Sequence, residues 1–225
     1  HVGRLNVSTT VYYAIGTENR GVFNTQKQQI NAGFFAAELS TDMYWIRPRL
    51  SWLYATGDNN PFDDRSTGFD AIVENPQFAG ADTSYWIRQS VGLIGGGKVA
   101  LSTRNGVLNN LRSSKEHGQS NFVNHGTVLL GVGVDLELTP QIRLSFNANY
   151  LAFATTQVLE VARHQQGIDK SIGVDLSAAL IYRPFVSQNA VVRLSWAHLV
   201  SGAGYNTLFP EENPYSMLFN VVLSY

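Results

Sequence analysis

The sequence contains no cysteine among its 225 residues, and neither sign of charge is in clear excess. Without cysteine the chain can form neither disulfides nor thiolate metal sites. With 16 Lys and Arg against 17 Asp and Glu, the net charge of -1 gives no electrostatic basis for binding nucleic acid. No apolar run approaches the roughly 18 residues of a membrane-spanning helix. Strands of a transmembrane barrel are not excluded, because alternation hides their hydrophobicity.

The clearest alternation lies at the C-terminal end, in residues 215–225. Counting back by twos from Tyr225 gives an unbroken apolar or aromatic row that reaches Tyr215, whereas the other phase is mixed and more polar. Because side chains of a strand alternate between its faces, one face of this strand meets an apolar environment. Such a strand is typical of the closing strand of an outer-membrane barrel, although a soluble sandwich also fits this strand alone.

The same alternation predicts further strands and sorts the connections between them into short and long. The predicted strands lie at 2–15, 28–40, 43–55, 84–94, 98–103, 126–138, 142–152, 172–183, 190–199 and 215–225. Short connections fall at 41–42, 95–97, 139–141 and 184–189, and long ones at 16–27, 57–83, 104–124, 154–170 and 201–214. Outer-membrane barrels alternate short periplasmic turns with long extracellular loops. The sorting depends on the weak strand at 98–103.

We therefore predict an all-β fold, an antiparallel transmembrane β-barrel of about ten strands in the bacterial outer membrane. Residues 1–225 form its single domain, with long extracellular loops near 57–83 and 104–124. The chain begins at His1 without a methionine or a signal peptide, which suggests a processed or partial chain. Additional strands before His1 would make it the C-terminal part of a larger barrel.

Six arginines fall on the polar phase of the predicted strands, which would face the interior of the barrel. They are Arg4, Arg47, Arg49, Arg88, Arg143 and Arg193. A charge on the lipid face would cost about 2–4 kcal/mol at mid-membrane, so any barrel keeps arginines inside. Guanidiniums lining a pore would also attract anions and bind each carboxylate through two parallel hydrogen bonds. In the alternative interpretation they pair with Glu38, Asp135, Glu137 and Asp175 and make the interior rigid.

Two loops carry a resemblance to a known family. TGDNNPFDDRSTGFDAIVENPQFAG at 56–80, followed by SYWIRQ at 84–89, resembles the alginate export family of outer-membrane barrels. LRSSKEHGQSNFVNHG at 111–126 is similar to a loop of relatives without an assigned role. The resemblance implies an outer-membrane porin for an anionic polysaccharide, with lumen arginines contacting uronate carboxylates. Barrels of that family have eighteen strands. A chain with ten strands would therefore be either the C-terminal part of such a barrel or a relative with another role.

Other chemistry has weaker support in the sequence. Asp58, Asp63 and Asp64 crowd oxygen ligands into one acidic loop, which suggests a calcium site, although the spacing differs from that of an EF-hand. The five histidines are scattered without a zinc motif. Ten strands is also the count of omptin-type barrel proteases, and His164 or His198 could be cast with the loop aspartates, but no motif supports an enzyme.

The expected function is an outer-membrane porin or export channel that passes an anionic polysaccharide or another anionic solute through an arginine-lined lumen. The expected partners are outer-membrane lipid and this solute, with no cofactor other than the calcium considered above. The alternative is a structural barrel that holds a partner protein, for example an electron-transfer cytochrome. A barrel protease is the third hypothesis.

Overall fold

The structure is a computed structural model that describes residues 4–19, 23–69, 79–80, 125–185, 189–210 and 214–223. These residues form an all-β fold with two short helices. The strands are β1 (Leu5–Glu18), β2 (Gln28–Thr41), β3 (Ile46–Ala55), β4 (Arg65–Ser66), β5 (Thr127–Glu137), β6 (Ile142–Phe153), β7 (Ser171–Tyr182), β8 (Ala190–Ser201) and β9 (Tyr215–Leu223). The helices are α2 (Gln157–Arg163) and α3 (Ala203–Leu208).

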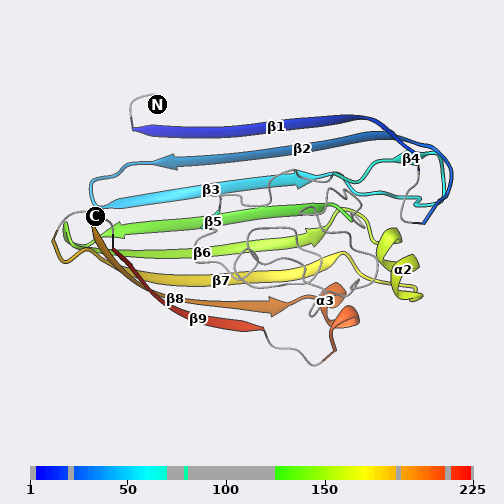
Figure 1. The fold of residues 1–225 in the computed structure, drawn as a ribbon. Helices are drawn as coiled ribbons and strands as arrows, with labels where there is room; N and C mark the ends of the chain where they lie inside the picture. The colour runs from blue at the N-terminus through cyan, green and yellow to red at the C-terminus, as the bar shows by residue number, and fades with distance from the viewer. Residues whose placement is uncertain are drawn as a thin grey trace.

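The strands form one antiparallel meander in the order β1-β2-β3-β5-β6-β7-β8-β9, with β4 pairing in parallel with β2 (Figure 1). The connections at 42–45, 138–141 and 183–189 lie at one end of the sheet, which we call the short-turn end. Those at 19–27, 56–126, 154–170 and 202–214 leave and re-enter the sheet at the other end, the long-loop end. The sheet is open, because in the described part of the chain β1 pairs only with β2 and β9 only with β8.

Eight of the predicted strands are confirmed, with boundaries that differ by a few residues. The predicted strands at 84–94 and 98–103 lie outside the described residues. Their predicted place between β3 and β5 is wrong, because these two strands pair directly from Ile46 opposite Leu136 to Ala55 opposite Thr127. The chain therefore leaves β3 at Ala55 and enters β5 at Thr127, both at the long-loop end. Short and long connections alternate between these eight strands, so the alternation does not depend on a strand at 98–103.

The predicted loops contain three elements that alternation does not reveal. The two-residue β4 pairs with Gln29 and Ile30 of β2, beyond the point where the β2–β3 ladder ends. Helices α2 and α3 have 7 and 6 residues, and neither has a side-chain hydrogen bond at its N-cap. Helices this short rely on packing against the rest of the fold for their stability. Within the described ranges no helix has the length and hydrophobicity to cross a membrane.

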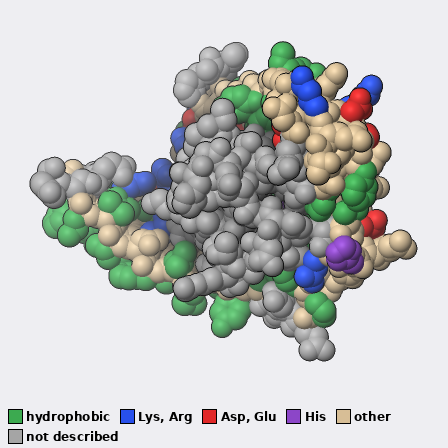
Figure 2. All heavy atoms as spheres, turned by 45° about the vertical axis from the view of Figure 1, so that its right-hand side comes forward, with side chains coloured by type: hydrophobic (Ala, Val, Ile, Leu, Met, Phe, Trp, Pro, Cys, Tyr) green, Lys and Arg blue, Asp and Glu red, His purple; other side chains and the backbone are tan. Residues whose placement is uncertain are grey.

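The two faces of the meander differ in chemistry. We call the face with Arg49, Ser51 and Asp135 the inner face, and the opposite one, with Leu50, Trp52 and Val134, the outer face. Outer-face positions of the eight strands carry no Asp, Glu, Lys or Arg, and many of their large apolar side chains are exposed, such as Val132 at 57% and Phe219 at 67%. Figure 2 shows hydrophobic side chains grouped along the lower left of the molecule in that view.

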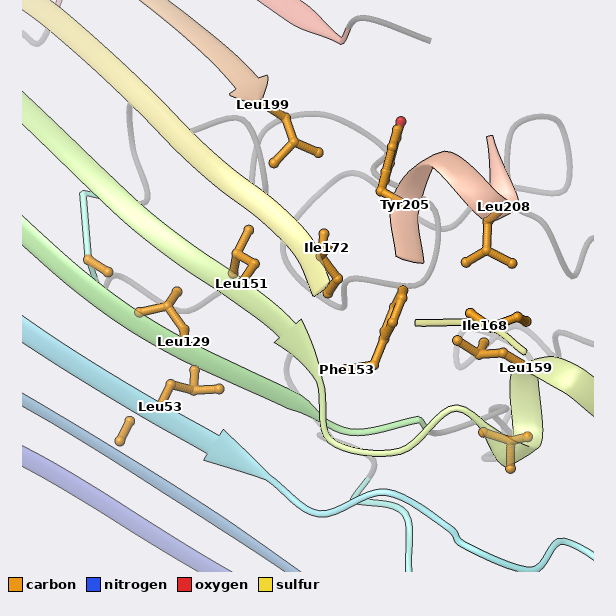
Figure 3. Packing of buried hydrophobic residues seen from close by; sticks show 13 residues of the cluster. Leu53, Leu129, Leu151, Phe153, Leu159, Ile168, Ile172, Leu199, Tyr205 and Leu208 are labelled. Atoms are coloured by element: carbon orange, nitrogen blue, oxygen red, sulfur yellow. The ribbon is translucent and has the colours of Figure 1, made fainter. Parts of the chain in front are cut away.

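A hydrophobic core lies at the long-loop end of the inner face. Leu53, Leu129 and Leu151 contribute to it from β3, β5 and β6, and helices α2 and α3 supply Leu159, Tyr205 and Leu208 (Figure 3). Leu129, Leu151 and Leu159 are fully buried. This end of the inner face is therefore packed, while the polar side chains occupy the middle of the sheet and its short-turn end.

Candidate functional site on the inner face

A layer of buried polar side chains crosses the middle of the inner face. Asp175 lies opposite Asn149, Asn149 opposite Gly131, Gly131 opposite Ser51, and Ser51 opposite Glu38, so the layer spans five adjacent strands. Asp175 is 0% exposed and Asn149 1%. The next positions toward the short-turn end include the buried Ser145, Asn147, Ser177 and Ser195. Burying so many polar groups requires hydrogen bonds inside the protein.

Arg49 of β3 is the centre of a hydrogen-bond network beside this layer, one inner-face position nearer the short-turn end. Its Nη1 lies 3.2 Å from Oδ2 of Asp135, and its Nη2 donates to Oδ1 of Asn147 at 2.6 Å. Ser145 donates to the other oxygen of Asp135 at 2.7 Å, and Asn147 donates to Oγ of Ser177 at 3.2 Å. These contacts join β3, β5, β6 and β7 across the sheet. The pair of Arg49 with Asp135 is one of those expected in the alternative interpretation, in which the arginines pair with acidic residues of the interior.

The short-turn end of the inner face holds a second set of charges. Arg143 binds Glu137 through Nε and Nη2, and Nη1 of Arg183 lies 3.9 Å from the same carboxylate. Two guanidiniums thus share one acid, which leaves one positive charge in excess. Arg183 is absent from the predicted arginine set, although it shares the polar phase of its strand with Asp175 and Ser177. That phase was the signal that could have identified it.

The remaining predicted arginines lie near the same end. Nε of Arg47 lies 2.5 Å from Asp42, and the guanidinium of Arg4 stacks over the ring of Tyr44 at 5.1 Å. A hydrogen bond from Asn6 and the bond from Arg47 hold the pKa of Asp42 below its usual value. Arg193 of β8 lies opposite Asn220. Arg88 lies outside the described residues.

The structure therefore brings five arginines to the short-turn end, of which four belong to the predicted set. The described carboxylates at the same end are Asp42, Glu137 and Asp135, which lies opposite Arg47, so the five arginines still leave positive charge in excess there. The arginines are Arg4, Arg47, Arg143, Arg183 and Arg193. In the middle of the sheet the balance is reversed, because Glu38 and Asp175 accompany the single Arg49.

A turn from the long connection between β3 and β5 packs against the buried polar layer. The backbone N–H of Ala79 donates to Oε2 of Glu38 at 3.1 Å, and Nδ2 of Asn149 donates to the carbonyl oxygen of Ala79 at 3.0 Å. Ala79 is 3% exposed and belongs to the hydrophobic core, while Gly80 lies against Asn147. Residues 79–80 thus pack on the inner face, against Glu38 of β2 and Asn149 of β6.

The acidic loop does not gather its carboxylates into a metal site. Asp58 accepts a bond from the N–H of Asn60 at 3.0 Å, and Asp63 from that of Arg65 at 2.8 Å. Asp64 contributes its backbone carbonyl to the N–H of Gln29 at 2.7 Å. Burial raises the pKa of Asp58. The part of the chain that the structure describes contains no group of three or more His, Cys, Asp or Glu placed to hold a metal ion.

His125 precedes β5 and is buried against Phe153, with the two ring centroids 4.8 Å apart. Its Nδ1 contacts the carbonyl oxygen of Gly126 at 2.5 Å. Burial lowers the pKa of His125 to about 4, so the ring is neutral at physiological pH. A neutral histidine among hydrophobic neighbours packs the long-loop end of the sheet. His164 and His198, the two histidines considered for a protease, lie on α2's C-terminal end and on β8.

Comparisons with protein-family models, with curated proteins and with solved structures found no match to this chain. The resemblance of its loops to the alginate export family stays a prediction.

Proposed function

We propose that this chain forms part of the wall of a β-barrel in the bacterial outer membrane, and that its inner face lines a channel for anionic solutes. The observation that carries the proposal is the outer face, which has no Asp, Glu, Lys or Arg on any of eight adjacent strands. A soluble protein rarely exposes so large a continuous apolar surface. In a bilayer such a surface is required, and every charge must lie on the other face.

The outer-face aromatic residues support the same environment. Phe35 lies opposite Tyr54, and Tyr150 is level with Trp52, two residues nearer the short-turn end. Tyr215 is level with Ala148, two residues further in the same direction. The aromatic band therefore crosses the strands obliquely. Strands of transmembrane barrels are tilted by about 35–45°, so a girdle level with the membrane surface must shift in this way along the sheet.

The contents of the inner face favour a barrel wider than eight strands. An eight-stranded barrel has an interior just wide enough for its own side chains. Here the inner face also accommodates the backbone of Ala79 and Gly80. The start of β1 and the end of β9 both lie at the short-turn end, so an even number of further strands would close the wall. Closure would also satisfy the backbone groups of β1 and β9 that pair with no strand among the described residues, which lipid cannot do.

The excess of arginine at the short-turn end favours an anionic solute. In outer-membrane barrels the short turns face the periplasm, so this end would receive solutes that leave the cell. Guanidiniums bind carboxylates through paired hydrogen bonds, and rings of arginine select anions in pores. The proposed solute class is an anionic polysaccharide or a smaller anion, consistent with the loop resemblance to alginate exporters.

The test is ion selectivity in a planar bilayer, measured on full-length protein extracted from membranes. We expect heat-modifiable gel mobility, single-channel currents and a reversal potential that favours anions in a KCl gradient. The triple variant Arg143→Gln, Arg183→Gln, Arg193→Gln should shift the reversal potential toward cation preference, because Glu137 then stands without its partners. Lys170→Gln, which removes an exposed charge at the long-loop end, is the control and should leave selectivity unchanged.

Protein without heat-modifiable mobility would contradict the membrane location. Heat-modifiable protein that carries no current and copurifies with a partner would instead support the structural barrel. Anion preference that survives the triple substitution would exclude the arginine cluster as the selecting element.

A further inference from the structure

We propose that three aromatic side chains on the inner face stack against the sugar rings of an anionic polysaccharide that passes along β1. They are Tyr12, Phe34 and Phe69, which contact one another and which we call the aromatic platform. The inference rests on the proposed channel function and deepens it, because it selects a polysaccharide over a smaller anion as the solute.

Tyr12 is an aromatic residue on the polar phase of its strand. It lies opposite Phe34 of β2, and Phe34 lies opposite Ala55 of β3, so all three positions belong to the inner face. Tyr12 is 58% exposed. The other inner-face residues of β1 are small or polar, namely Asn6, Ser8, Thr10, Ala14, Gly16 and Glu18. A ring that is neither buried in the core nor on the lipid-facing side has its surface available to a solute in the interior.

The rings of the platform have a fixed arrangement. The centroid of the Tyr12 ring lies 5.8 Å from that of Phe34 and 6.3 Å from that of Phe69, and the planes of the Tyr12 and Phe69 rings differ by 14°. The N–H of Phe69 donates to the carbonyl oxygen of Thr56 at 2.8 Å. The hydroxyl of Thr56 accepts from the N–H of Gly33 at 3.0 Å, next to Phe34 in β2. Rings held in this way lose little freedom when a ligand binds.

A sugar ring matches the chemistry of this platform. The C–H bonds on one face of a pyranose carry a slight positive charge, and the face of an aromatic ring is negative. The hydroxyl groups at the edge of the sugar require polar partners, and Ser8 and Thr10 offer hydroxyls on the same face of β1 as Tyr12. Ser8 is exposed and Thr10 is half-buried. Aromatic surface with a few polar groups beside it is the usual composition of a site for a small organic ligand.

The separation between the arginines and the platform favours a polymer over a small anion. Arg4 at the short-turn end and Tyr12 are eight positions apart on the same phase, which corresponds to about 27 Å in an extended strand. A small anion occupies one of these places at a time. A polyuronate contacts the arginines through its carboxylates and the platform through its rings, and such simultaneous contacts raise affinity.

The experiment measures how an oligouronate and its monosaccharide block the chloride current of the full-length protein in planar bilayers. We expect the oligouronate to half-block the current at a far lower concentration than the monosaccharide does. Tyr12→Leu should raise that concentration about five- to tenfold, because leucine keeps the apolar bulk without the face of a ring. Tyr12→Phe should match the unmodified protein. Tyr13→Leu is the matched control and should also match it, since Tyr13 is the adjacent tyrosine, 66% exposed on the outer face.

Phe69→Leu provides a second route if Tyr12→Leu fails to fold, as heat-modifiable mobility would show. It removes the ring nearly parallel to Tyr12 and should raise the half-blocking concentration in the same direction by a smaller factor.

A folded Tyr12→Leu or Phe69→Leu protein with an unchanged half-blocking concentration would overturn the platform, while an anion-selective current would leave the channel function intact. Equal block by oligouronate and monosaccharide would also overturn it, in favour of a small anion. Equal weakening in Tyr12→Leu and Tyr13→Leu would contradict the assignment of the effect to the inner face. An unmodified protein that carries no current would overturn the channel function, and this inference with it.

Discussion

The outer and inner faces of this sheet are organised by different physical rules. On the outer face each residue is apolar or uncharged independently of its neighbours, as Leu130, Val132 and Val134 illustrate along β5. On the inner face the role of each side chain depends on residues from other strands, as with Arg49, whose partners lie on β5 and β6. One face is thus specified by composition, and the other by particular contacts. Substitutions should therefore have different consequences on the two faces.

The largest expected effect is on the inner face, at the pair formed by Arg49 and Asp135. Asp135→Ala removes the carboxylate that accepts from Arg49 at 3.2 Å and from Ser145 at 2.7 Å. Arg49 would keep its bond to Asn147 but lose its counter-charge in a largely buried place. Breaking a buried pair by removing one partner costs about 3–5 kcal/mol. Urea unfolding of the detergent- or lipid-reconstituted protein measures this loss of free energy.

The double variant Arg49→Met, Asp135→Ala tests whether the loss comes from the unpaired charge. Replacing both partners by uncharged residues is often nearly neutral, so the double variant should recover much of the stability. If it is as unstable as Asp135→Ala, the hydrogen bond from Ser145 contributes more than the ion pair does.

On the outer face, the effect of introducing a single charge should distinguish a lipid-facing barrel wall from the sheet of a soluble protein. Val132 is 57% exposed near the middle of β5. Val132→Lys should destabilise the protein in lipid by about 2–4 kcal/mol, because the ammonium would face the hydrocarbon. The unfolding free energy in lipid vesicles measures the effect, and Val132→Thr is a control of similar shape without charge. A Val132→Lys protein as stable as Val132→Thr would contradict the lipid-facing assignment.

The contrast between the two faces also explains which parts of the fold could be predicted from the sequence. Alternation requires only neighbouring residues along one strand, so eight strands and their two phases were predicted correctly, including the inner phase of Arg47, Arg49, Arg143 and Arg193. The pairing of Arg143 with Glu137 was also among the expected alternatives. The placement of Arg47 and Arg49 on one face follows from their spacing alone.

The features that were missed depend on contacts distant in the sequence. The alternation at 84–94 predicted a strand that follows β3 in the sheet. Instead β3 pairs directly with β5, and residues paired at their ends, such as Ala55 and Thr127, are more than seventy positions apart in the sequence. Helix α2 has only 7 residues, and its N-cap Thr156 makes no side-chain hydrogen bond to the helix, so its formation depends on packing more than on a local signal. The contact of Ala79 with Glu38 spans 41 positions and uses a backbone N–H, which no side-chain pattern can reveal.

The smallest of the expected effects is a pH dependence that arises from the packed long-loop end. The pKa of His125 is lowered by burial to about 4, below the value near 6.5 of an exposed histidine. Its contribution to stability is therefore complete above pH 6.5 and is lost as the pH falls toward 4, because the unfolded chain binds the proton more readily. Between pH 7 and pH 5 the loss should be about 2 kcal/mol, measured by urea unfolding at each pH.

Two histidine variants test whether the pH dependence of stability arises at His125. His125→Phe keeps an aromatic ring against Phe153 and removes the titrating group, so stability between pH 7 and pH 5 should become flatter. His198→Gln, on the outer face of β8, should leave the slope unchanged, because it lies on the opposite face of the sheet from Phe153 and leaves the packing of His125 intact. A slope that persists in His125→Phe and disappears in His198→Gln would place the pH-sensitive packing on the outer face. That result would reverse the contrast between a face set by composition and a face set by contacts.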